Sequence, residues 1–292
     1  MRSEPGEPKP RRSASRLDAL AILHPFPSIL NAALVAAIVL ISGGSATAAA
    51  TLAGAMVTIQ FSIGVTNDLA DEPADRRGRP RKPLVRGDIR RGTAMALAIA
   101  LGTGGLGLAA SWGPIELALL AAMYGCGLAY DLGLKRRGLG WLAYAVAFPL
   151  LPAYAWFGAT GEWPPRYEVL LPLAALAGPA LAIANGLVDH DRDTAAGERT
   201  LVVRLGRRRA LLIMATLLLV IHVAASLTLA PASVLTLVST GGSALLAALG
   251  VVFSRGAAAP TRERGWQLQA VSIALLATAW FTAAVLQGRP SG

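Results

Sequence analysis

The chain is poor in cysteine, in charge and in aromatic residues. Its single cysteine, Cys126, has no partner for an intramolecular disulfide. Only 15% of the 292 residues are charged, whereas a soluble domain of this length usually carries about 25%. Aromatic residues amount to a modest 6%. These shortages argue against an ordinary soluble globular protein.

Long apolar runs take the place of the missing charge. The chain is 54% hydrophobic, and Ala, Leu and Val form runs that are long enough to cross a bilayer core. This pattern predicts an all-α polytopic membrane bundle of about nine transmembrane helices in residues 18–292, a single domain preceded by a disordered basic tail at 1–17. We place the spans at 27–43, 46–65, 93–111, 114–130, 139–157, 169–188, 210–230, 232–253 and 266–286.

The formal net charge of +10 is distributed unevenly. Of the 27 Lys and Arg residues, 25 lie in the N-terminal tail or in loops after even-numbered spans, and only Arg166 and Arg289 lie elsewhere. Cytoplasmic loops carry the Lys/Arg excess. The chain is therefore expected to be a multi-pass protein of the cell inner membrane, with a cytoplasmic N-terminus and an external C-terminus. Its basic charge is explained by topology and by contact with membrane lipid, so no nucleic-acid partner is expected.

Two polar motifs with the same spacing end the second and the sixth span. Their members are Asn67, Asp71 and Asp75 in motif one, with Asp68 as an extra carboxylate, and Asn185, Asp189 and Asp193 in motif two. A similar basic segment follows each motif, at residues 81–87 and 199–206. The chain thus reads as two four-span pseudo-repeats plus one span, and repeats of this kind often place a site at their interface.

The four-residue spacing places each set of oxygen atoms on one face of a helix, at its cytoplasmic end. Closely packed carboxylates repel one another unless a cation neutralises them. Oxygen ligands without His or Cys suit Mg²⁺, which combines one or two carboxylates with substrate phosphates. Two facing motifs therefore predict a magnesium-bridged diphosphate site, with Asp71 and Asp189 at the centre of the two sets.

Basic side chains near the motifs suit the same anionic ligand. Arg79 and Lys82 lie in a proline-restricted segment after motif one. Lys135 and Arg136 follow the fourth span, where a lysine can neutralise a leaving diphosphate, and Tyr130 precedes them.

These residues resemble those of the UbiA-type intramembrane prenyltransferases. The specific likeness is the pairing of an N-D-x-x-D-x-x-x-D motif with a second D-x-x-x-D motif, and the flanks 79–87 and 197–201 are similar as well. One feature departs from the family. Tyr130 and Lys135 are five residues apart rather than four, which would turn Tyr130 about 100° around an α-helix.

The resemblance implies a nine-helix bundle with a central cavity and a Mg²⁺-dependent transfer of a prenyl group from an isoprenoid diphosphate to an acceptor. We expect an aromatic quinone precursor as the acceptor. A glycerol phosphate lipid, a porphyrin, a phosphosugar or an internal cyclisation are the alternatives, and a membrane transporter is the alternative of a different class. The expected catalytic residues are Asp71, Asp189 and Lys135, and the expected substrate contacts are Asn67, Arg79, Lys82, Tyr130, Arg136 and Asn185. The expected Mg²⁺ ligands are Asn67, Asp68, Asp71, Asp75, Asp189 and Asp193.

Overall fold

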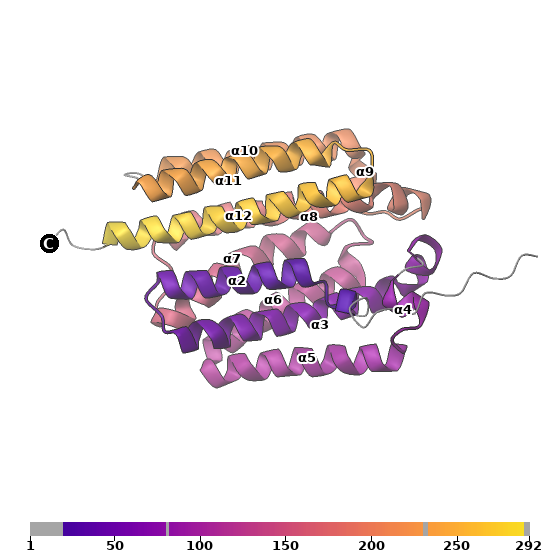
Figure 1. The fold of residues 1–292 in the computed structure, drawn as a ribbon, viewed down its shortest axis with the longest axis horizontal. Coiled ribbons are helices and arrows are strands. Elements are labelled where there is room, and N and C mark those ends of the chain that lie inside the picture. The colour runs from indigo at the N-terminus through magenta and orange to yellow at the C-terminus, as the bar shows by residue number, and fades with distance from the viewer. Residues whose placement is uncertain (1–19, 80–81, 230–232, 289–292) are drawn as a thin grey trace, which may run out of the picture.

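The computed structural model describes residues 20–79, 82–229 and 233–288, and the basic tail at 1–17 lies outside them. The described chain is all-helical and forms a bundle of long helices that run roughly side by side (Figure 1). Eight of these helices are long and apolar enough to cross a membrane, and a ninth, shorter apolar helix spans Pro25–Ile41. The expected all-α membrane bundle is confirmed.

The helix order repeats itself. The first half contains α2 (Pro25–Ile41), α3 (Ala46–Gly78), the short α4 (Pro83–Arg86), α5 (Arg91–Trp112) and α6 (Pro114–Ala129). The second half contains α7 (Gly140–Thr160), α8 (Tyr167–Ala195), the short α9 (Leu201–Leu205), α10 (Arg207–Thr228) and α11 (Val234–Ser254). The last helix, α12 (Ala259–Gly288), stands outside the repeat, and a short 3₁₀ segment, η1 (Leu20–Leu23), precedes α2.

The second helix of each half is the one that carries a motif. Helix α3 has 33 residues and α8 has 29, so at about 1.5 Å per residue each exceeds the roughly 30 Å apolar core of a bilayer. The excess length contains motif one and the last part of motif two, so both helices continue beyond the apolar spans predicted from the sequence. The short helices α4 and α9, which follow the motifs, lie at the same end of the bundle (Figure 1).

The buried core joins both halves around a common interior. Its main cluster combines side chains from α2, α3, α5, α6, α7, α8, α10 and α12. Close helix contacts fix the motif end of this core. Gly186 in motif two has no room for a Cβ, because that atom would lie 2.6 Å from the Val202 side chain of α9. The glycine therefore lets α9 pack directly on motif two.

Candidate active site

The two motifs face one polar cleft of about 490 Å³ near the ends of α3 and α8. Asp71 and Asp75 of motif one and Asp193 of motif two line it, together with Lys135 from the segment after α6. Asp75 and Asp193 are only 1% and 3% exposed. The motifs are about 120 residues apart in the sequence but form one cluster of buried carboxylates.

Two basic residues from the segment after α6 lie against Asp71. The Lys135 ammonium group donates a 2.8 Å hydrogen bond to Asp71, and the Arg136 guanidinium lies 3.6 Å from the same carboxylate. Arg136 also donates to the Ala70 carbonyl at 2.6 Å. Burial by itself would lower the pKa of Lys135, but the carboxylates of Asp71 and, further away, Asp189 raise it above its usual value. Lys135 is thus a permanent cation at the cleft wall.

Asp68 faces a different set of partners. It is 2% exposed and lies 2.9 Å from the His24 ring and 2.7 Å from the Lys82 ammonium group. Lys82 also lies 2.8 Å from Asp75, so a single ammonium group neutralises two carboxylates of motif one. His24 holds this position at the start of α2 with a left-handed backbone, at φ 48°.

Asn67 forms a hydrogen bond with a residue at the end of the fourth span. Its side-chain amide donates a 2.7 Å hydrogen bond to Asp131, which is 4% exposed. This contact fixes the direction of the Asn67 amide. Neither Asn67 nor Asp68 is among the residues that line the polar cleft, so the cleft is formed by the later carboxylates of motif one.

Arginine side chains connect motif two to motif one. Arg79, just after α3, forms an ion pair with Asp189. Arg192 lies 3.1 Å from Asp189, 2.9 Å from Asp193 and 3.7 Å from Asp75. The predicted residues Arg79 and Lys82 therefore do reach the motif carboxylates, and the charges of the cluster are balanced internally.

Tyr130 lies in the site in spite of its unusual distance from Lys135. Residues 130–134 form a π-type turn, in which the Lys135 N–H donates to the Tyr130 carbonyl at 3.1 Å. The expected 100° displacement is wrong because the chain is not α-helical here and the π turn accommodates the extra residue. Tyr130, Lys135, Asn185 and Asp189 consequently line one small pocket of about 30 Å³.

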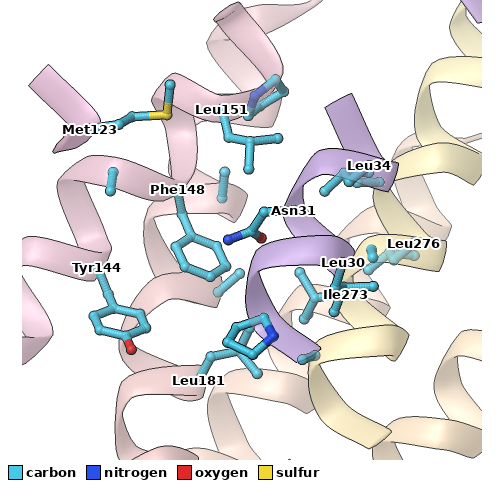
Figure 2. A pocket seen from close by; sticks show the side chains of 18 of the residues that line it. Leu30, Asn31, Leu34, Met123, Tyr144, Phe148, Leu151, Leu181, Ile273 and Leu276 are labelled. Atoms are coloured by element: carbon cyan, nitrogen blue, oxygen red, sulfur yellow. The ribbon is translucent and has the colours of Figure 1, made fainter. Parts of the chain in front are cut away.

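An apolar cavity of about 240 Å³ lies inside the bundle, next to this pocket. Tyr130 lines both spaces. Figure 2 shows Asn31 extending from α2 toward Phe148 of α7 inside the cavity. Tyr130, Tyr144 and Phe148 form an aromatic row along the wall, with ring centroids 5.3 and 5.8 Å apart. The site therefore combines a charged cleft, a small polar pocket and an apolar chamber, and Tyr130 lines both the pocket and the chamber.

Three residues of this site were missed by sequence reasoning. Arg192 lies inside motif two but counts as one more positive charge in a cytoplasmic loop. Asp131 directly follows Tyr130, and His24 precedes the first span. A carboxylate next to a candidate site tyrosine was the available signal for Asp131. The sequence gives no sign that His24 meets a residue 44 positions away.

The side chains of this site are suited to bind a magnesium ion in place of some of these cations. Within the described ranges, no three His, Cys, Asp or Glu side chains already form a metal ligand set. The chemistry of the donors is nevertheless suitable, since they are carboxylate oxygens. Both Asp75 oxygens are buried and accept no hydrogen bond within the same ranges. Lys82 lies at ion-pair distance from one of them, without hydrogen-bond geometry, so their lone pairs can serve a metal.

Comparison with known proteins agrees with this geometry. Residues 27–278 match the UbiA prenyltransferase family. A digeranylgeranylglyceryl phosphate synthase from Methanoculleus marisnigri is 32% identical over 174 residues, which cover 58% of this chain and 62% of the relative. The enzyme of the same name from Methanoregula boonei is 29% identical, over 66% of this chain and 70% of the relative. The chain thus matches somewhat less than two thirds of the length of the first of these relatives.

Solved structures share the fold. A UbiA homologue from Archaeoglobus fulgidus bound to GPP and Mg²⁺ superposes with a TM-score of 0.69 at 18% identity, over 92% of this chain and 99% of that one. The apo UbiA homologue from Aeropyrum pernix K1 gives a TM-score of 0.70 at 20% identity, over 86% and 96%. On the family match and this shared fold, the chain belongs to the UbiA prenyltransferase family.

Proposed function

We propose that this protein transfers a prenyl group from an isoprenoid diphosphate to an acceptor in a Mg²⁺-dependent reaction. The observation that carries the proposal is the succession of three spaces: the apolar chamber and a small polar pocket share Tyr130, and that pocket shares Lys135 and Asp193 with the carboxylate cleft. An isoprenoid diphosphate has the same division into a charged head and an apolar chain. The A. fulgidus homologue, which shares the fold, was solved with GPP and with DMAPP, each together with Mg²⁺.

The head group belongs in the polar cleft in this proposal. Asp71, Asp75 and Asp193 would hold Mg²⁺ there, together with Asp189 from the adjoining small pocket. Asn67 and Asp68 would join the ligand set only on leaving Asp131, His24 and Lys82. The bound ion supplies positive charge to the diphosphate oxygens. Lys135 and Arg136, with Arg79 and Lys82, would contact the diphosphate when they are no longer paired with the carboxylates. Tyr130 and Asn185 would orient it from the small polar pocket.

The reaction breaks the bond between the allylic carbon and the diphosphate oxygen. Diphosphate leaves with the electron pair, the acceptor forms a new bond to that carbon, and the acceptor loses a proton. The fixed cation Lys135 stabilises the charge that develops on the leaving group. The apolar wall formed by Tyr144 and Phe148 keeps water away from the electron-poor carbon.

For the acceptor, we propose a non-aromatic glyceryl phosphate lipid. The matching relatives are digeranylgeranylglyceryl phosphate synthases, and this favours the alternative over the aromatic quinone precursor that we expected from the sequence. Arg136 and Arg192 at the polar cleft can bind an acceptor phosphate as well as a diphosphate.

We also propose that the cleft opens to the cytoplasm. The protein is an integral multi-pass membrane protein, and the segregation of Lys and Arg supplies the orientation. In this orientation the motif end of α3 and α8 faces the cytoplasm.

The test is to incubate the purified protein with a panel of prenyl diphosphates, with Mg²⁺ or with chelator, and to analyse products by mass. One arm offers a monoprenylated glyceryl phosphate and the other a hydroxylated aromatic carboxylate. We expect product in the first arm only, and loss of more than nine tenths of it in Asp71→Ala and in Asp189→Ala. Retention of a tenth or more of the activity, a barrier change of about 1.4 kcal/mol or less, would contradict the roles given to the motifs.

A further inference from the structure

Arg262 carries the largest fully buried side chain of the described residues, with 1% exposure. It lies in the first turn of α12, after the eighth span, where charge counting treats it only as a topology signal. A guanidinium group is costly to bury unless its donors are paired. The complete burial of Arg262 therefore requires hydrogen-bond and ion-pair partners at fixed positions around its guanidinium group.

The partners of Arg262 belong to motif two and to the connection between α11 and α12. One terminal nitrogen donates to the Asp191 carboxylate at 2.8 Å and to the Val188 carbonyl at 3.2 Å. The other donates to the carbonyls of Ala257 and Gly256. One side chain thus ties the start of α12 to the end of α8.

A second arginine holds the same connection. Arg207, at the start of α10, donates to the Arg255 carbonyl at 2.7 Å and also to the Gly256 carbonyl. The connection between α11 and α12 is therefore held by hydrogen bonds from both α10 and α12. These bonds fix the start of α12, from which Arg262 reaches α8.

Arg262 holds α8 at Asp191, a residue on the rim of the polar cleft whose side chain leaves the helix in a different direction from those of the inner carboxylates. At about 100° per residue, Asp191 lies about 160° around the helix from both Asp189 and Asp193. Asp191 is 63% exposed at the rim, whereas Asp189 and Asp193 turn inward to Arg192. Fixing Asp191 and the Val188 carbonyl therefore sets the rotation at which the two inner carboxylates face motif one.

We propose that Arg262 is a positioning residue for the metal site, through its hold on motif two at Asp191 and the Val188 carbonyl. The inference rests on the proposed function, because it assumes that Asp189 and Asp193 bind Mg²⁺. Residues that orient metal ligands from outside change metal affinity about 10- to 100-fold when they are replaced. A purely structural role would lower the yield of folded protein but would leave the metal affinity of the folded molecules unchanged.

The experiment measures Mn²⁺ binding by electron paramagnetic resonance on the purified full-length protein, in the presence of geranyl diphosphate. We expect Arg262→Gln to raise the half-saturating Mn²⁺ concentration about tenfold. The control is Arg264→Gln, in the same helical turn but exposed, which should change it less than twofold. Arg262→Lys keeps a cation in the buried position but cannot hold both sets of partners as the guanidinium group does, so it covers the case in which Arg262→Gln does not fold. It should raise the concentration several-fold.

The outcomes separate the two proposals. An unchanged Mn²⁺ half-saturation in Arg262→Gln, or in Arg262→Lys if the first variant does not fold, would overturn the positioning role and leave the proposed function standing. A wild-type protein that binds no Mn²⁺ with the diphosphate would overturn both. A protein that shows the expected shift but makes no prenylated product would support the positioning role and contradict only the proposed reaction.

Discussion

Replacing Lys82 with methionine tests whether the cations of the site occupy the place of a metal ion. The Lys82 ammonium group lies 2.7 Å from Asp68 and 2.8 Å from Asp75, and its side chain is 14% exposed. The two carboxylates are 2% and 1% exposed. Methionine keeps the apolar length of the side chain and removes its charge, so both acids lose their shared cation.

The expected loss of stability follows from this burial. Removing one partner from a buried ion pair costs about 3–5 kcal/mol, because a charge remains without compensation. His24 still lies 2.9 Å from Asp68 and Arg192 lies 3.7 Å from Asp75, which places the loss near 3 kcal/mol, the lower end of that range. Mg²⁺ should restore most of it, since a ligand at 100 times its dissociation constant contributes about 2.7 kcal/mol. In the wild-type protein the ion must first displace Lys82, so its effect should be smaller.

The assay is unfolding in detergent, followed with and without Mg²⁺, for wild type and Lys82→Met. The control is Arg76→Met, because Arg76 pairs with Glu72 four residues before it and is 62% exposed; this pair should contribute less than about 1 kcal/mol. The reasoning is refuted if Lys82→Met unfolds like the control without metal, or if Mg²⁺ stabilises it no more than it stabilises wild type.

Three further outcomes follow from the site. Gly140→Ala should lower turnover at least tenfold with normal expression, because its Cβ would lie 2.6 Å from the Tyr130 ring. The control is Gly125→Ala, where the added atom meets open space and turnover should not change. Equal turnover in both variants would contradict the placement of Tyr130. Trp280→Ala should shift donor preference toward longer prenyl chains several-fold in a competition assay, since this side chain lines the chamber far along α12; an unchanged preference would argue against the chamber as the binding site of the chain. A cysteine placed at Ala74 in a cysteine-free background should be labelled only from the cytoplasmic side, and labelling only from outside would reverse the proposed topology.

The sequence predicts the bundle well because its signals are local. Apolar run length and the distribution of Lys and Arg define spans without any knowledge of packing. The four-residue spacing of each motif correctly indicates that α3 and α8 remain helical beyond the apolar spans. The similar basic segments after the motifs correspond to the short helices α4 and α9.

The detailed pairing within the site could not be predicted in the same way. The contacts of Asn67 with Asp131 and of Arg79 with Asp189 join residues 64 and 110 positions apart, so they depend on how the helices pack. Charge counting also cannot tell a buried arginine from a solvated one. The π turn at Tyr130 was missed because regular α-helical geometry was assumed for a segment with one extra residue.

The most direct test of the central claim is calorimetric titration of a prenyl diphosphate into the purified protein, with Mg²⁺ and after chelation. Without metal, a diphosphate can take Lys82, Lys135 and Arg192 only by leaving buried carboxylates without cations, which is unfavourable. The account therefore predicts binding with Mg²⁺, its loss on chelation, and a Ca²⁺ complex that restores binding better than turnover because the coordination of Ca²⁺ is looser. Tight binding of the diphosphate in the absence of any metal would contradict it and would assign recognition to the basic residues alone.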